Sequence, residues 1–181
     1  MIIAQEKRRT NIAEFILYMW QLEDLIRGSQ FDIEEIEQNI IRKFRQPVEI
    51  KYEIRDWYIN LIQMMKQERI EQQGHLSFVN NLMADVSQLH MRYIHNSDDS
   101  EYHLLYYQAK PNIQALIDKS GHDRMSEIEA CLTGLYGFFL MRLQNKEISR
   151  ETTDAMATIS NLMAALSKRF REIEAGEREL P

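Results

Sequence analysis

The histidines are the side chains of this sequence best suited to bind a metal ion. A di-iron site in a helical bundle uses Glu-x-x-His, because this spacing places both ligands on one face of a helix. His90 and His95 lie about 140° apart around a helix, so they do not share a face, and we interpret them as surface or partly buried histidines. The sequence predicts no metal ligand and no cofactor, since the motif is absent at every histidine: the residues three positions before His75, His90, His95, His103 and His122 are Gln72, Ser87, Arg92, Ser100 and Lys119.

Two further features resemble parts of enzyme active sites. His122 and Asp123 form an adjacent pair, as in one class of metal-dependent phosphohydrolases, but that chemistry needs ligands from other helices. The pair follows Ser120-Gly121, where a loop is expected, so a helix-capping role for Asp123 is the simpler interpretation. Cys131 would be a nucleophile only with a lowered pKa and a nearby base. It lies one residue from a predicted buried stripe, so we predict an inert, buried thiol and no catalytic residue.

Trp20, Glu23, Asp24 and Arg27 form the densest polar cluster of the sequence. Glu23 and Arg27 are four residues apart on a predicted helix, where they can form an ion pair worth about 0.3 kcal/mol. Trp and Arg are favoured at the centres of protein interfaces, so this cluster is a candidate interaction site. We favour the simpler interpretation, a solvated helix face beside a buried tryptophan.

Aromatic residues also gather beside a predicted loop. Tyr93 precedes this loop, and Tyr102, His103, Tyr106 and Tyr107 follow it. These side chains could line a pocket or a dimer contact, although half-buried tyrosines with hydrated hydroxyls are the more common arrangement. We assign neither cluster a catalytic, cofactor-binding or metal-binding residue.

Three basic runs could bind a phosphate-bearing partner if they converge in space. They are Lys7-Arg-Arg9, Arg42-Lys-Phe-Arg45 and Lys168-Arg-Phe-Arg171. The last two lie near predicted helix C-termini, where the helix dipole favours cations, and this is a sufficient explanation for them. Because the net charge is −6, nucleic-acid binding is a less favoured alternative.

Apolar residues at alternating steps of three and four predict helices along the whole chain. Asp32 followed by Glu35 resembles a capping box, and Pro47 forces a break after that helix. Pro111 predicts either two short helices or one kinked helix ending near residue 120. The predicted helices span residues 3–27, 32–46, 48–73, 77–95, 100–120, 126–146 and 149–174.

Helices with apolar stripes must bury them against one another. The chain has 44% apolar and 28% charged residues, typical of a globular protein, and only 6 Gly and 3 Pro, too few for a β-rich fold. The sequence therefore predicts an all-α, single-domain helical bundle of about seven helical segments over residues 1–174, with a frayed tail over 175–181.

The cellular location can be predicted from the apolar segments and the cysteine content of the sequence. The N-terminal residues lack the apolar core of a signal peptide, and the densest apolar stretch, residues 132–141, is shorter than the roughly 20 residues that cross a bilayer. A single cysteine permits no intramolecular disulfide. We expect a cytoplasmic protein that does not associate with membranes.

A family resemblance adds to these expectations. The run Met1-Ile-Ile-Ala-Gln-Glu-Lys-Arg8, continuing through Asn11-Ile-Ala-Glu14 to Tyr18-Met-Trp-Gln-Leu-Glu-Asp-Leu-Ile-Arg27, resembles an uncharacterised bacterial family, a domain of unknown function found mainly in Bacteroidetes. The segments Lys119-Ser-Gly121, Glu127-Ile-Glu-Ala-Cys131 and Leu135-Tyr-Gly137 fit the same family. The resemblance covers nearly the whole chain and implies a small helical protein without a known activity or site.

We therefore expect a non-enzymatic protein that binds another protein or itself. One alternative is a bundle that binds a small molecule or a metal through polar residues of separate helices, because spacing along the sequence cannot show such convergence. A second alternative is weak nucleic-acid association through the basic runs.

Overall fold

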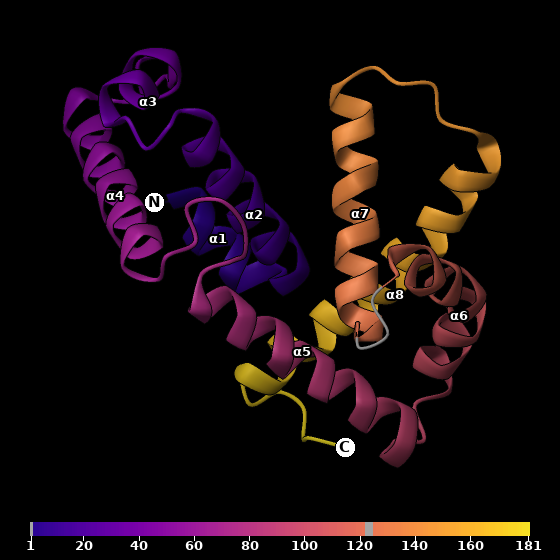
Figure 1. Cartoon of the computed structure of the whole chain (residues 1–181). Helices are drawn as coiled ribbons and strands as arrows, with labels where there is room; N and C mark the ends of the chain where they lie inside the picture. The colour runs from indigo at the N-terminus through magenta and orange to yellow at the C-terminus, as the bar shows by residue number, and fades with distance from the viewer. Residues whose placement is uncertain (1, 122–124) are drawn as a thin grey trace.

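The computed structural model describes residues 2–121 and 125–181, and these residues form helices and no strands (Figure 1). The all-α class predicted from the sequence is confirmed. The elements are α1 (Ile2–Thr10), α2 (Ile12–Gly28), α3 (Ile33–Asn39), a short 3-10 helix η1 (Ile41–Lys43), α4 (Val48–Gln67), α5 (Ser77–Asn96), α6 (Ser100–Ser120), α7 (Glu127–Leu143) and α8 (Arg150–Glu174).

The helices are arranged as two groups joined by α5 and α8. In Figure 1, α1 to α4 lie on one side, α6 and α7 lie on the other, and α5 runs along the base. The longest helix, α8, contacts α6 and α7 as well as α5, α2 and α1. Its Ile159, Leu162 and Leu166 are completely buried. The apolar stripe of α8 therefore closes one continuous core that both groups share.

The first helix is broken where the sequence predicted a continuous one. Asn11 adopts an extended conformation (φ −155°, ψ 103°) between α1 and α2, and its side chain accepts a hydrogen bond from the Glu14 amide at 3.1 Å. The Asn11 side-chain amide in turn donates to the Glu14 carboxylate at 3.2 Å. The prediction of one helix over 3–27 was wrong. The apolar spacing continues across Asn11, but the two side-chain hydrogen bonds of this N-cap begin a new helix there.

The fourth helix is shorter than predicted. α4 ends at Gln67, and the left-handed conformation of Arg69 (φ 57°) turns the chain away from the helix axis. The Glu68 carboxylate then accepts hydrogen bonds from the Ser77 amide (2.7 Å) and hydroxyl (2.8 Å). Glu68 therefore fastens the 68–76 segment to the start of α5.

Two other local predictions are corrected in part. Asp32 caps α3 by accepting from the Glu34 amide at 2.9 Å, but its own amide donates to the Ser29 carbonyl rather than to Glu35, so the capping box is incomplete. Pro111 lies inside a single helix, α6. A proline there removes the hydrogen bond to the carbonyl of Tyr107. Tyr107 is 78% exposed, so water can bind that carbonyl.

Arg169 of α8 is a buried cation that fixes the start of α6. Its Nε and Nη2 atoms donate to the two oxygens of Asp99 at 2.8 Å each, and the guanidinium lies 5.2 Å from the ring centroid of Tyr102. Asp99 is also the N-cap of α6, accepting from the Tyr102 amide at 3.0 Å. The hydrogen bonds from Arg169 hold the pKa of Asp99 below its ordinary value of 3.8.

The tail beyond α8 turns back over the same network. Arg178 forms a 2.7 Å ion pair with Glu172 and lies 3.7 Å from Asp99. Fraying of residues 175–181 stays a prediction.

We predict that Asp99→Asn lowers the free energy of unfolding by about 2 kcal/mol at neutral pH, because it removes the less exposed of the two carboxylates that pair with Arg169 and leaves only Glu101, at 3.0 Å, while keeping a side chain that can cap α6. Since the pKa of Asp99 is lower in the folded chain than in the unfolded chain, its contribution is complete above the unfolded value and is lost as the pH falls through the folded value. Urea titrations should show a constant difference between about pH 7 and 5 that shrinks below about pH 4. The neighbouring exposed Asp98→Asn should change little, and equal losses for both variants would contradict the assignment.

Candidate functional site

Helix α7 is buried along only its first half. Ser126 caps it by accepting from the Glu129 amide at 3.1 Å, and the acidic residues of the first turn suit the helix dipole. Ile128, Cys131 and Leu132 are completely buried in the core. No residue from 133 to 143 is buried. We call residues 133–143 the exposed half of α7.

The exposed half of α7 is apolar on every side. Arg142 is its one charged residue, and the guanidinium lies 4.6 Å from the ring centroid of Phe138. Leu140 is 36% exposed and Leu143 is 61% exposed. A helix that is apolar around its whole circumference is ordinarily buried. Leu135, Tyr136 and Phe138 are half-buried against the core, whereas Leu140 and Leu143 are exposed, so the described chain covers these turns only in part.

An apolar hollow of about 340 Å³ lies beside the exposed half of α7. A Cβ atom at Gly134 would lie 2.6 Å from Cδ1 of Leu116, so glycine at this position lets α6 approach α7 closely. At Gly137 a Cβ would have no neighbour within 4 Å, which leaves the hollow open there. Methionine side chains at 125, 141 and 156 line it and can adapt to an inserted side chain. Leu140 and Leu143 therefore protrude from the same helix that lines the hollow.

The predicted cluster around Trp20 is an internal brace. The Glu23 carboxylate is 1% exposed and accepts from the Leu76 amide at 3.0 Å, while its other oxygen lies 2.6 Å from Nδ1 of His75. Trp20 is buried, with its ring stacked on that of His75 at 4.4 Å and edge-on to that of Tyr136 at 5.7 Å. The prediction that Glu23 lies on a solvated face was wrong, because the chain of residues 75–76 covers it.

Arg27 and Asp24 complete this brace. Arg27 pairs with Asp24 at 3.0 Å, not with Glu23 as the spacing predicted, and it also donates to the carbonyls of Ile70 (3.1 Å) and Gly74. Tyr136 of α7 donates to the second oxygen of Asp24 at 2.6 Å. Burial and the Asp24 carboxylate raise the pKa of Tyr136. The cluster thus joins α2 to the 68–76 segment and to α7.

The tyrosines near the loop contribute to a second enclosed network. Nδ1 of His90 lies 2.7 Å from the Tyr102 hydroxyl, and Nε2 lies 2.8 Å from the Glu127 carboxylate. Tyr106 donates to the other oxygen of Glu127 at 2.9 Å. The hydrogen bond from His90 lowers the pKa of Glu127. A neutral imidazole that donates through Nε2 and accepts through Nδ1 satisfies every partner.

The expectation of an exposed or half-buried His90 was therefore wrong, because this imidazole is 1% exposed. His103 does not belong to this network. Its Nε2 lies 2.8 Å from the Tyr93 carbonyl. Tyr107 is 78% exposed. Of the aromatic residues near the loop, Tyr102 and Tyr106 belong to the His90 network, and the Tyr93 ring lies 5.0 Å from that of Tyr102.

A family model described as a domain of unknown function, DUF4924, matches residues 1–177 of the chain. This chain belongs to the DUF4924 family. The family description names no activity, in agreement with the resemblance found in the sequence, and a bacterial origin stays a prediction. No curated protein and no solved structure matches the chain.

Cys131 is buried in this DUF4924 chain, as predicted. The thiol is completely buried, and burial raises its pKa to about 12, so it carries no thiolate at neutral pH. Over residues 2–121 and 125–181, no three His, Cys, Asp or Glu side chains are placed to hold a metal ion. The pair His122-Asp123 lies outside the described residues. Among the helices of the described chain, none is long and apolar enough to span a bilayer.

We predict that Glu127→Ala lowers the free energy of unfolding by about 2 kcal/mol, because it leaves the buried His90 and the half-buried Tyr106 hydroxyl without their acceptor. Glu129→Ala is the matched control: it removes a carboxylate from the same first turn of α7 without touching this network. Chemical denaturation of both variants tests the assignment. Equal losses would mean that the helix dipole, and not the network, accounts for the role of Glu127.

Proposed function

We propose that this DUF4924 domain is a non-enzymatic, cytoplasmic self-association module in which the exposed halves of α7 from two copies pack against each other. The observation that carries the proposal is the apolar character of residues 133–143 on all sides of a helix, with none of these residues buried. Removal of such a surface from water favours association.

A second copy is the partner that this surface suits best. In a two-fold dimer each subunit presents the same patch, so the patch must contain both a projection and a recess to receive it. Leu140 and Leu143 supply the projection, and the hollow beside Gly137 supplies the recess. Both belong to α7, so a two-fold axis near this helix can pair them reciprocally.

The charge distribution supports the same partner. Interfaces between identical subunits are more apolar at their centre than transient interfaces, with a polar rim. The centre here carries one charge, Arg142, which is stacked on its own Phe138. The adjoining surface of α6 and α8 carries Lys119, Glu151 and Asp154, so the rim has both signs. Two copies of a rim with both signs can face each other without net repulsion.

The buried networks support a binding role over catalysis. Two networks contain the titratable pairs described above, His90–Glu127 and Glu23–His75. The polar atoms of these pairs have partners inside the protein. These pairs join α5 to α7 and α2 to the 68–76 segment, which is the use expected of satisfied buried polar groups.

We predict that the wild-type chain sediments as a dimer and that Leu140→Asp/Leu143→Asp shifts it to a monomer, because two carboxylates at the interface would lose their hydration. Leu104→Asp on α6 is the matched control, since Leu104 is 58% exposed and Leu143 is 61% exposed. Analytical ultracentrifugation over a concentration series gives the dissociation constant, and far-ultraviolet dichroism checks that all variants stay helical.

A second variant tests the recess. Gly137→Leu fills space that is open in the folded monomer, so it should leave the fold intact and weaken dimerisation at least about tenfold. A wild-type chain that is monomeric at hundreds of micromolar, or a dimer unaffected by both α7 variants, would overturn the proposal.

A further inference from the structure

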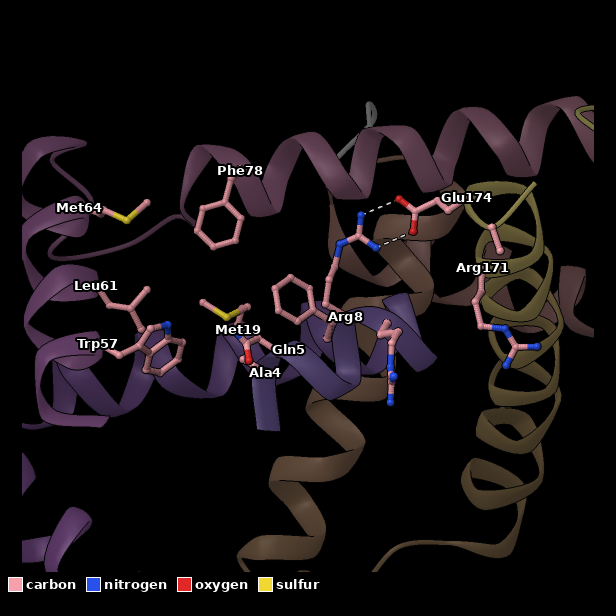
Figure 2. Close-up of a pocket in the computed structure, with 13 residues that line it drawn as sticks. Ala4, Gln5, Arg8, Met19, Trp57, Leu61, Met64, Phe78, Arg171 and Glu174 are labelled. Carbon is pink, nitrogen blue, oxygen red and sulfur yellow. Dashed lines mark hydrogen bonds and ion pairs between the residues drawn. The ribbon is translucent and has the colours of Figure 1, made fainter. Parts of the chain in front are cut away.

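A groove that α7 does not line is formed by α1, α2, α4, α5 and α8. It has a volume of about 660 Å³, within the range of pockets that hold small molecules. Figure 2 shows its two ends: Trp57, Leu61 and Met64 of α4 stand at one end, and Arg8 and Arg171 stand at the other. We call it the N-terminal groove.

The α4 end of the N-terminal groove is apolar. Phe15, Met19 and Leu61 are buried beneath it, and Trp57 and Phe78 are half-buried walls. No charged side chain of α4 or α5 lines the groove. A flexible hydrocarbon chain would remove these half-buried walls from water, at roughly 25 cal/mol for each Å² of apolar surface covered.

The other end of the groove is cationic. Two of the three basic runs predicted from the sequence converge here, since Arg8 and Arg9 of α1 and Arg171 of α8 all line it. Arg8 is neutralised by Glu174, with which it forms two hydrogen bonds of 2.7 and 2.6 Å. The third run, residues 42–45, lies around η1 and does not line the groove.

Arg9 and Arg171 remain without a carboxylate. Neither forms an ion pair or a side-chain hydrogen bond with the described residues, and both are exposed at the mouth of the groove. Glu172, the chain neighbour of Arg171, is already bound to Arg178 at 2.7 Å. Two arginines from different helices therefore line the groove with unused donors, and planar carboxylates suit such donors.

We propose that the N-terminal groove binds one molecule of a single-chain fatty carboxylate, with the hydrocarbon chain along Met19, Trp57 and Leu61 and the carboxylate between Arg9 and Arg171. The polarity of the groove matches this ligand, because the apolar walls and the unpaired cations lie at opposite ends. A concave site of this volume favours a monomeric ligand over a flat membrane surface. The carboxylate would bridge α1 and α8, so binding should also stabilise the fold.

The test uses the full chain and dodecanoate below its micellar concentration. We expect saturable binding of one molecule by isothermal titration calorimetry, a change in tryptophan fluorescence from Trp57, and a rise in melting temperature. Butyrate has the head without the chain and should not bind detectably. Dodecanol has the chain without the charge and should bind at least about tenfold more weakly.

Two arginine double variants distinguish binding at the proposed site from nonspecific binding to basic residues. Arg9→Gln/Arg171→Gln should weaken dodecanoate binding at least about tenfold, since hydrogen bonds to charged groups are the strong ones. The matched control, Arg42→Gln/Arg45→Gln, removes the same charge from the basic run outside the groove and should bind as the wild type does. Leu140→Asp/Leu143→Asp should also retain binding, because α7 does not line this groove.

Several results would overturn the assignment. They are an absence of saturable binding, equal affinities for dodecanol and dodecanoate, or the same loss in both arginine double variants. Binding to anionic phospholipid vesicles without binding to monomeric dodecanoate would assign the arginines to a membrane surface instead. Dodecyl phosphate that binds at least about tenfold more tightly than dodecanoate would replace the carboxylate by a phosphate head.

Discussion

Burial of the α8 apolar face is the constraint on which the rest of the structure depends. An isolated amphipathic helix of this length gains most of its stability from packing its stripe, and α8 packs Ile159 and Leu166 against helices from both ends of the chain. Because one helix serves both groups, α1 is held against the end of α8 through Arg8 and Glu174, while α6 lies along α8 from Thr158 to Arg169. The N-terminal groove and the hollow beside α7 are both bounded by this helix.

The side chains that most resemble catalytic groups form the interior braces of the fold. A buried polar group must find a partner, and in this protein the partners come from distant elements: Glu23 of α2 meets His75, and His90 of α5 meets Glu127 of α7. The first contact therefore fixes the 68–76 segment on α2, and the second fixes the separation of α5 and α7. Arg169 does the same between α8 and the start of α6, through Asp99.

Two partly apolar surfaces are left in contact with water. The exposed half of α7 leaves apolar side chains in water, and the N-terminal groove leaves apolar walls beside two unpaired arginines. The exposure of each surface costs free energy in the isolated chain, because water stays in contact with its apolar side chains. Their chemistry differs: the first is nearly uncharged and self-complementary, whereas the second is amphipathic with cations at one end. That difference is why we assign a second copy of the chain to one and a fatty carboxylate to the other.

The sequence by itself determined the helical class and most helix boundaries, because apolar periodicity and capping act within a few residues of one another. The helices predicted to begin at residues 126 and 149 begin at residues 127 and 150, and the loop before α6 lies where it was predicted. Only the tertiary structure decided the partners of Glu23 and His90, the convergence of Arg9 with Arg171, and the half of α7 that stays uncovered. These depend on how helices distant in sequence cross, and a periodic stripe shows that a face needs burial without showing which surface buries it.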